Sequence, residues 1–226
     1  MQLHKISLIT VSLVLLTAYA QEELPYGPTY GTFTTLLDHY SSNGMSPTFT
    51  IQYIIDAQYW DPQVGPILFY AGNEGDIEGF YENSGFVRKT LAQRFKALVL
   101  FGEHRYFGKS FPFPKETAFN AENNVYLTVE QTMMDYVELV KYIRHRYAAT
   151  QVPCFVFGGS YGGMLAAWLR MKFPSTFQGA LASSAPVIYF KGAVESGELR
   201  EDDFGYIISK AFAETEYGQE CFDTIK

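Results

Sequence analysis

The sequence predicts an α/β protein with a mostly parallel sheet, on three observations. Short apolar runs alternate with helical patterns from about residue 48 to residue 185, which is typical of strands joined by crossover helices. The apolar run at residues 152–157 leads directly into a glycine-rich turn and then into a stretch rich in alanine and leucine. Hydrophobic residues make up 47% of the 226 residues and charged residues only 18%, so the composition is that of a folded core.

The individual elements follow from the local pattern. Continuous apolar runs bounded by glycine or proline predict buried strands, whereas alternating apolar and polar residues predict a half-exposed strand. Thr128 and Gln131 form a capping box, in which the threonine hydroxyl and the glutamine side chain satisfy free amides at a helix start. The predicted elements are a half-exposed strand at 49–55, a buried strand at 66–71, a helix at 86–95, a buried strand at 97–101, a helix from 128 to about 146, a strand at 152–157, a helix at 164–172 and a strand at 179–187.

The turn after the strand at 152–157 contains the motif G-x-S-x-G at Gly158, Ser160 and Gly162. In a nucleophile elbow, a strand turns so sharply into a helix that the residues two before and two after the serine must be small. The buried-strand pattern before the motif and the helix-forming stretch that ends at Pro174 match this arrangement. We therefore predict an α/β-hydrolase fold with Ser160 as the catalytic nucleophile.

The first 20 residues predict a secretory signal peptide, with Lys5 ahead of an apolar stretch and a small-x-small site that ends at Ala20. No later segment has 18 unbroken apolar residues, so we expect a lysosomal or extracellular protein without a membrane anchor after cleavage. The formal net charge of −7 argues against a nucleic-acid partner. Cys154 is predicted to be a buried free thiol, whereas Cys221 would need a partner in an oxidising compartment.

Four spaced segments resemble one known family. They are residues 37–40 (LDHY), 68–76 (LFYAGNEGD), 103–110 (EHRYFGKS) and 158–186, which contains the elbow. In this order they resemble the S28 serine peptidases, and Ala166, Ala167 and Trp168 are most similar to the Pro-X carboxypeptidase branch. Phe107 and Lys109 stand where that family more often has tyrosine and glutamate, which affects local packing and charge but not the fold.

The resemblance implies a serine carboxypeptidase that cleaves peptide substrates after proline and needs no cofactor. It also implies a helical cap domain inserted after the strand near residue 185, followed by the triad aspartate and histidine. We therefore expect a signal peptide at 1–20, the N-terminal part of an α/β-hydrolase domain at 21–190 and the start of the cap at 191–226. Without a triad histidine, the 226 residues alone should have no more than trace hydrolase activity.

Other functions stay open on the sequence alone. The chain could be a non-catalytic short isoform or a pseudoenzyme that acts as a binding fragment. It could also belong to a dipeptidyl peptidase II-like aminopeptidase of the same family, or to an esterase or lipase on the same fold. A homodimer of the full-length form is a further open alternative.

The predicted oxyanion hole combines the backbone N–H of Tyr161 with Asn73, in the loop after the strand at 66–71. Glu74 and Asp76 in the same loop either recognise a charged end of the substrate or cap the following helix. No spacing of cysteine, histidine and acidic residues predicts a metal site.

None of the histidines is predicted to be the triad base, because hydrolase triads run serine, acid and histidine along the chain. His39 stands beside Asp38 in a pairing that resembles a family feature outside the triad. His145 ends a surface helix, and residues 103–105 (Glu-His-Arg) suggest a structural ion-pair network.

Overall fold

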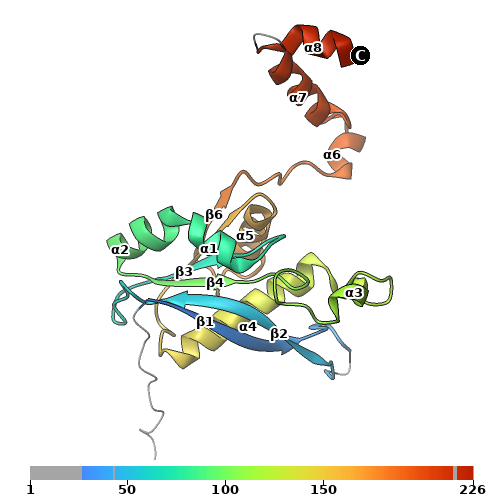
Figure 1. Cartoon of the computed structure of the whole chain (residues 1–226). Helices are drawn as coiled ribbons and strands as arrows, with labels where there is room; N and C mark the ends of the chain where they lie inside the picture. The colour runs from blue at the N-terminus through green and yellow to red at the C-terminus, as the bar shows by residue number, and fades with distance from the viewer. Residues whose placement is uncertain (1–26, 43, 216–217, 226) are drawn as a thin grey trace, which may run out of the picture. The chain divides into compact units, whose positions relative to one another are not determined.

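The computed structural model describes residues 27–42, 44–215 and 218–225, which form two compact units divided after Ala185 (Figure 1). The predicted signal peptide at 1–20 lies outside the described residues. The sequence placed the boundary after residue 190, whereas the structure divides the chain just past the strand that follows the elbow helix.

The first unit is built on a six-stranded sheet with the order β1-β2-β4-β3-β5-β6. The two pairs that involve β2 are antiparallel, and the pairs β3–β4, β3–β5 and β5–β6 are parallel. The strands are β1 (Pro28–Leu36), β2 (Thr48–Asp56), β3 (Ile67–Ala71), β4 (Leu98–Gly102), β5 (Cys154–Gly159) and β6 (Gly179–Ser183). The mostly parallel sheet predicted from the sequence is therefore confirmed, and the arrangement is an α/β-hydrolase fold.

Helices cover both faces of this sheet. The elements of the first unit are α1 (Ile77–Asn83), a π-helical turn (Phe86–Leu91) that continues into α2 (Ala92–Phe95), α3 (Lys115–Ala118), a 3-10 turn (Asn124–Tyr126), α4 (Val129–Arg146) and α5 (Tyr161–Lys172). Side chains of α4 and α5 share one core with β2, β3 and β5, while α1 and α2 pack on the opposite face of the sheet (Figure 1). Because the helices sit on either side, the central strands are buried on both faces.

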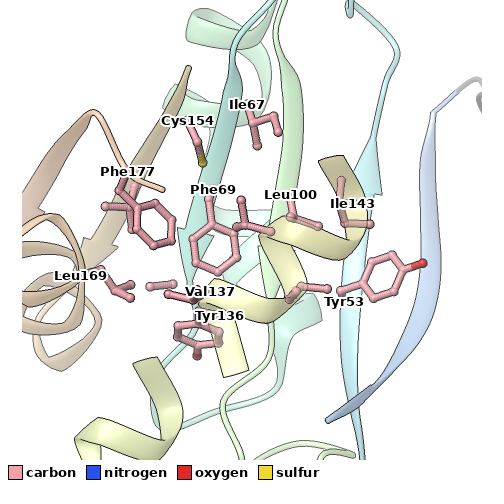
Figure 2. Packing of buried hydrophobic residues seen from close by; sticks show 14 of the residues in the cluster. Tyr53, Ile67, Phe69, Leu100, Tyr136, Val137, Ile143, Cys154, Leu169 and Phe177 are labelled. Carbon is pink, nitrogen blue, oxygen red and sulfur yellow. The ribbon is translucent and has the colours of Figure 1, made fainter. Parts of the chain in front are cut away.

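The larger core is centred on Phe69 of β3 (Figure 2). Its ring lies 5.2 Å from the ring of Tyr136 on α4 and 5.8 Å from that of Phe177, measured between centroids. All three side chains are fully buried, and each aromatic side chain of this size removes a large apolar area from water. This core fixes α4 and α5 against the strands whose ends carry the candidate site.

Two strands differ clearly from the sequence prediction. The strand β1 was not predicted, because PTYGTFTTL places threonines and a glycine between its apolar residues and most of its side chains are exposed. The strand predicted at 179–187 ends at Ser183, and its side chains are mostly exposed because β6 lies at the edge of the sheet.

The capping box at α4 forms only in half. The hydroxyl of Thr128 accepts a hydrogen bond from the backbone N–H of Gln131 at 3.3 Å, as predicted. The Gln131 side chain does not return to the cap. It donates to Asp38 at 2.6 Å and accepts from the backbone N–H of His39 at 2.9 Å, because these partners bring the segment after β1 against the start of α4.

The second unit consists of three helices: α6 (Lys191–Glu195), α7 (Asp203–Ala213) and α8 (Gly218–Ile225). The α7 helix exposes a row of large apolar side chains, which are Phe204, Tyr206, Ile207, Ile208 and Phe212. Across the described ranges, none of the helices has the length and apolar character needed to cross a membrane.

Candidate active site

Ser160 occupies the corner between β5 and α5. Its backbone has φ 54° and ψ −124°, a left-handed conformation that is strained for any residue with a side chain. The backbone holds this conformation from both sides, because the Ser160 N–H donates to the carbonyl of Ser183 at 2.9 Å and the Ser160 carbonyl accepts from Met164 at 3.0 Å. The serine is exposed at the carboxyl ends of the parallel strands, where ligands of open α/β sheets bind.

The two motif glycines are required by close backbone contacts at this corner. A Cβ atom on Gly158 would lie 2.0 Å from the carbonyl oxygen of Gly162. A Cβ atom on Gly162 would lie 2.8 Å from the carbonyl oxygen of Ala71 at the end of β3. Real Cβ atoms do not approach that closely, so the spacing of the motif follows from the packing of the elbow against the neighbouring strand.

The structure brings both predicted oxyanion-hole residues to Ser160. Tyr161 is the first residue of α5, so its backbone N–H belongs to the helix N-terminus, where the dipole favours negative charge. Asn73 follows β3, and its side-chain amide lies 3.4 Å from the carbonyl oxygen of Gly159. The catalytic role of the two residues stays a prediction.

The two acidic residues of the loop after β3 do different things. Asp76 caps α1, and its carboxylate accepts from the backbone N–H of Glu78 at 2.8 Å. Of the two roles expected for Asp76, the structure therefore shows the helix cap. Glu74 is exposed, and its charge adds to the effect of burial in raising the pKa of Tyr161 beside Ser160. A role of Glu74 in recognising a substrate stays a prediction.

The residues after β4 form buried polar contacts, and the structural ion-pair network suggested by residues 103–105 forms through Arg105, whose partner is Asp135. Glu103 accepts hydrogen bonds from the backbone N–H groups of Ile77 at 3.1 Å and Lys109 at 2.9 Å, and from the Ser110 hydroxyl at 2.5 Å. Arg105 instead binds Asp135 of α4, with the two nitrogen–oxygen contacts at 2.7 and 2.8 Å. Glu103 and Arg105 thus hold different partners.

Asp135 is the residue that sequence reasoning missed. It is fully buried on α4 and also accepts from the Thr35 hydroxyl at 2.9 Å. His39 pairs with Asp135 at 2.8 Å, which corrects the expected pairing of His39 with Asp38. An aspartate inside the apolar side of a helix was the available signal, since a buried carboxylate requires a cationic partner elsewhere in the chain.

No histidine in the part of the chain that the structure describes makes a hydrogen bond to the Ser160 hydroxyl. His39 is bound to Asp135, and His145 is exposed near the end of α4. His104 is buried, with its Nε2 atom 3.0 Å from the hydroxyl of Tyr161. Among the described residues, the Ser160 corner therefore has no histidine bound to its hydroxyl.

The model of the family described as serine carboxypeptidase S28 matches residues 35–226, which include the elbow and both adjacent strands. The chain belongs to this family.

Relatives within the S28 family include lysosomal Pro-X carboxypeptidases. The chain is 43% identical over 166 residues to that of Homo sapiens, which covers 73% of this chain and 33% of the human protein. It is 40% identical over 195 residues to that of Pongo abelii, which covers 86% of this chain and 38% of the relative. This S28 chain thus spans little more than a third of the length of the curated relatives it matches, and these relatives indicate a serine peptidase.

One solved structure resembles the chain only distantly. The peroxisomal α/β-hydrolase of Saccharomyces cerevisiae is 14% identical, with a TM-score of 0.49, and the match covers 74% of this chain and 46% of that one.

Two positions that were expected from the sequence to depart from the family pattern have clear contacts. Phe107 packs the edge of its ring against His104, with 5.3 Å between the ring centroids. Lys109 forms an exposed ion pair with Glu78 of α1, at 3.0 Å. Both substitutions are therefore accommodated on the surface loop without disturbing the buried contacts of Glu103.

Across the described ranges, no group of three or more histidine, cysteine, aspartate or glutamate side chains is arranged to hold a metal ion. Cys154 is buried on β5 and Cys221 is half-buried on α8, and both thiols are free. Burial raises the pKa of Cys154 to about 12, so this thiol stays protonated and inert.

We expect the stability of this S28 chain to fall as the pH drops from about 6.5 to about 4, because of His104. Burial lowers the pKa of His104 from 6.5 to about 4 in the folded protein. Between these values the unfolded chain takes up a proton that the folded protein does not, so acid favours unfolding. The loss should approach about 3 kcal/mol by pH 4, as order-of-magnitude linkage arithmetic.

Urea unfolding at a series of pH values measures this effect. The His104→Gln variant should lose most of the His104 contribution to the slope, while the matched variant His145→Gln, at an exposed position, should keep the slope of the wild type. An unchanged pH slope in His104→Gln would contradict the assignment.

Proposed function

We propose that these residues form the nucleophile part of a serine exopeptidase that removes the residue after proline from the carboxyl terminus of peptides. The observation that carries the proposal is Ser160, held in a strained strand-to-helix corner of an S28 chain. The preference for proline rests on the similarity to lysosomal Pro-X carboxypeptidases. The predicted signal peptide and the names of these relatives together support a location in the secretory pathway or the lysosome.

In the proposed reaction, the Ser160 hydroxyl oxygen attacks the carbonyl carbon of the bond after proline. A base takes the hydroxyl proton and passes it to the leaving amine as the carbon–nitrogen bond breaks, and water then hydrolyses the acyl-enzyme ester. The Tyr161 N–H and Asn73 donate to the oxyanion. These donors are fixed before substrate arrives, so little reorganisation is needed when the negative charge develops.

The base and the aspartate that orients it are proposed to come from sequence outside these 226 residues. Two observations support this part of the proposal. No described histidine is bound to the Ser160 hydroxyl. The chain also covers only about a third of the length of each of these relatives. The 226 residues alone should then show trace hydrolysis, and a non-catalytic short form is the corresponding alternative.

A second candidate is a dipeptidyl peptidase II-like aminopeptidase, which Glu74 favours. This exposed carboxylate follows Asn73, and its negative charge helps to raise the pKa of Tyr161 next to the proposed nucleophile. A carboxylate near the site would attract the free amino terminus of a substrate and repel a free carboxylate.

Two peptides distinguish the candidates when tested on the complete protein to which these residues belong. One is acetylated at its amino terminus and ends in prolyl-phenylalanine with a free carboxylate, and the other has a free amino terminus, proline in second place and an amidated end. We expect release of phenylalanine from the first and little cleavage of the second. Cleavage of the second alone would support the aminopeptidase, and hydrolysis of simple acyl esters without either peptide would support an esterase.

A further inference from the structure

His104 is a buried titratable group that the proposed reaction does not use. It follows β4 and is only 1% exposed. Its Nδ1 atom lies 2.6 Å from the backbone carbonyl oxygen of Arg105, and its Nε2 atom lies 3.0 Å from the Tyr161 hydroxyl. The imidazole ring therefore joins the loop after β4 to the residue next to the nucleophile.

The hydrogen-bond partners assign the tautomer of this ring. A carbonyl oxygen can only accept, so Nδ1 carries the proton that is donated to Arg105, and Nε2 of the neutral ring is an acceptor. The Thr132 hydroxyl lies 3.2 Å from Nε2, but it donates to the carbonyl of Thr128 at 3.0 Å. The remaining donor for Nε2 is the Tyr161 hydroxyl.

The surroundings of the ring disfavour the imidazolium form. His104 lies two residues after β4 and is almost fully buried, and this burial outweighs the hydrogen bond to the Arg105 carbonyl and the charge of Asp135, which both raise the pKa of the ring. The edge of Phe107 covers the imidazole on another side. Burial lowers the pKa of His104 to about 4, so the ring stays neutral at the pH of acidic organelles.

The contact matters because Tyr161 has two connections to the site. Its backbone N–H is the proposed oxyanion donor, and its ring packs against the larger core of the first unit. The hydrogen bond from its hydroxyl to His104 fixes the side chain at a second point, since the Nδ1 donation to the Arg105 carbonyl holds the imidazole against the loop after β4. The first turn of α5 is thus anchored at the position where the oxyanion would bind.

We propose that His104 is a positioning residue, a neutral acceptor that holds the Tyr161 phenol and thereby orients the first turn of α5 behind Ser160. It is not the missing base, because its Nε2 atom is occupied by Tyr161 and its Nδ1 proton is donated to a carbonyl. The part that concerns catalysis rests on the proposed function, whereas the tautomer and the hydrogen bond do not.

Nitrogen-15 NMR of the imidazole rings in the 226-residue chain tests the tautomer without any activity measurement. The His104 signals are assigned by their absence in His104→Gln. We expect the pattern of a neutral ring protonated at Nδ1 at both pH 7 and pH 5, with the Nε2 shift altered in Tyr161→Phe. A ring protonated at Nε2, or an imidazolium at pH 5, would overturn the proposal.

Kinetics of the complete protein on a prolyl peptide test the positioning role. Tyr161→Phe and His104→Asn, which lacks an acceptor at the Nε2 position, should each lower kcat by about tenfold to 100-fold with little change in KM. Glutamine places its amide near the Nε2 position, so His104→Gln should recover most of the rate. The exposed His145→Gln variant should match the wild type.

The double variant His104→Asn with Tyr161→Phe completes the test. Because the two side chains act through one hydrogen bond, the double variant should be about as slow as either single variant. Multiplicative losses, or a His104→Asn variant as fast as wild type, would contradict the positioning role. A wild-type protein without peptidase activity would refute the proposed function, and the NMR result would still decide the hydrogen bond.

Discussion

Replacing Arg105 with methionine should destabilise the first unit by about 3–5 kcal/mol, the cost typical of breaking a buried ion pair from one side. The guanidinium is fully buried and donates to both carboxylate oxygens of Asp135. It also donates to the backbone carbonyls of Leu36, Leu37 and Tyr126 at 2.9 to 3.2 Å. Methionine fills much of the volume but leaves one buried carboxylate and three carbonyl oxygens without this donor.

Denaturant unfolding monitored by tryptophan fluorescence measures this loss. The control is Lys109→Met, which removes the exposed ion pair with Glu78 and should leave the unfolding midpoint nearly unchanged. Arg105→Lys keeps the charge but loses the bidentate contact with the Asp135 carboxylate. Its unfolding midpoint should therefore fall between those of wild type and Arg105→Met. Equal midpoints for Arg105→Met and Lys109→Met would show that the buried network does not support the fold.

Replacing Ser160 with alanine should lower the peptidase kcat of the complete protein by about 10⁴-fold or more, as for other serine peptidases that lose the nucleophile. The reason is that no other group forms the acyl-enzyme, and only the oxyanion donors and substrate binding remain. Hydrolysis of the prolyl peptide gives the readout, with the exposed Ser175→Ala as a matched control on the same unit. Alanine can adopt the same backbone conformation at position 160 as serine, so folding should be retained.

A loss of less than about tenfold in Ser160→Ala would mean that the reaction uses another nucleophile. A loss that appears equally in Ser175→Ala would point instead to a general loss of folded protein.

The elements that could be predicted from the sequence are those set by local patterns. The buried strands β3, β4 and β5 are continuous apolar runs, and the elbow is defined by glycines that sit within a few residues of Ser160. The edge strand β1 escaped prediction because it pairs with β2 through backbone hydrogen bonds while most of its side chains stay exposed. Edge strands of this kind carry little periodic signal.

The buried polar contacts could not be predicted, because their partners lie far apart in the sequence. Thr35 and Asp135 are 100 positions apart, and His39 and Asp135 are 96 apart. Gln131 has the spacing of a capping box, yet its side chain binds the segment after β1. Sequence spacing identifies the residue types of the network, whereas only the tertiary fold decides which of them pair.

The most direct test of the account is the reaction of Ser160 with a fluorophosphonate, mapped by mass spectrometry of the tryptic peptides. In the complete protein we expect one dominant adduct on Ser160 that is absent from Ser160→Ala, and in the 226-residue chain no more than a trace of it. A dominant adduct on a different serine, or rapid labelling of Ser160 in the 226 residues alone, would contradict a nucleophile whose base is supplied from elsewhere.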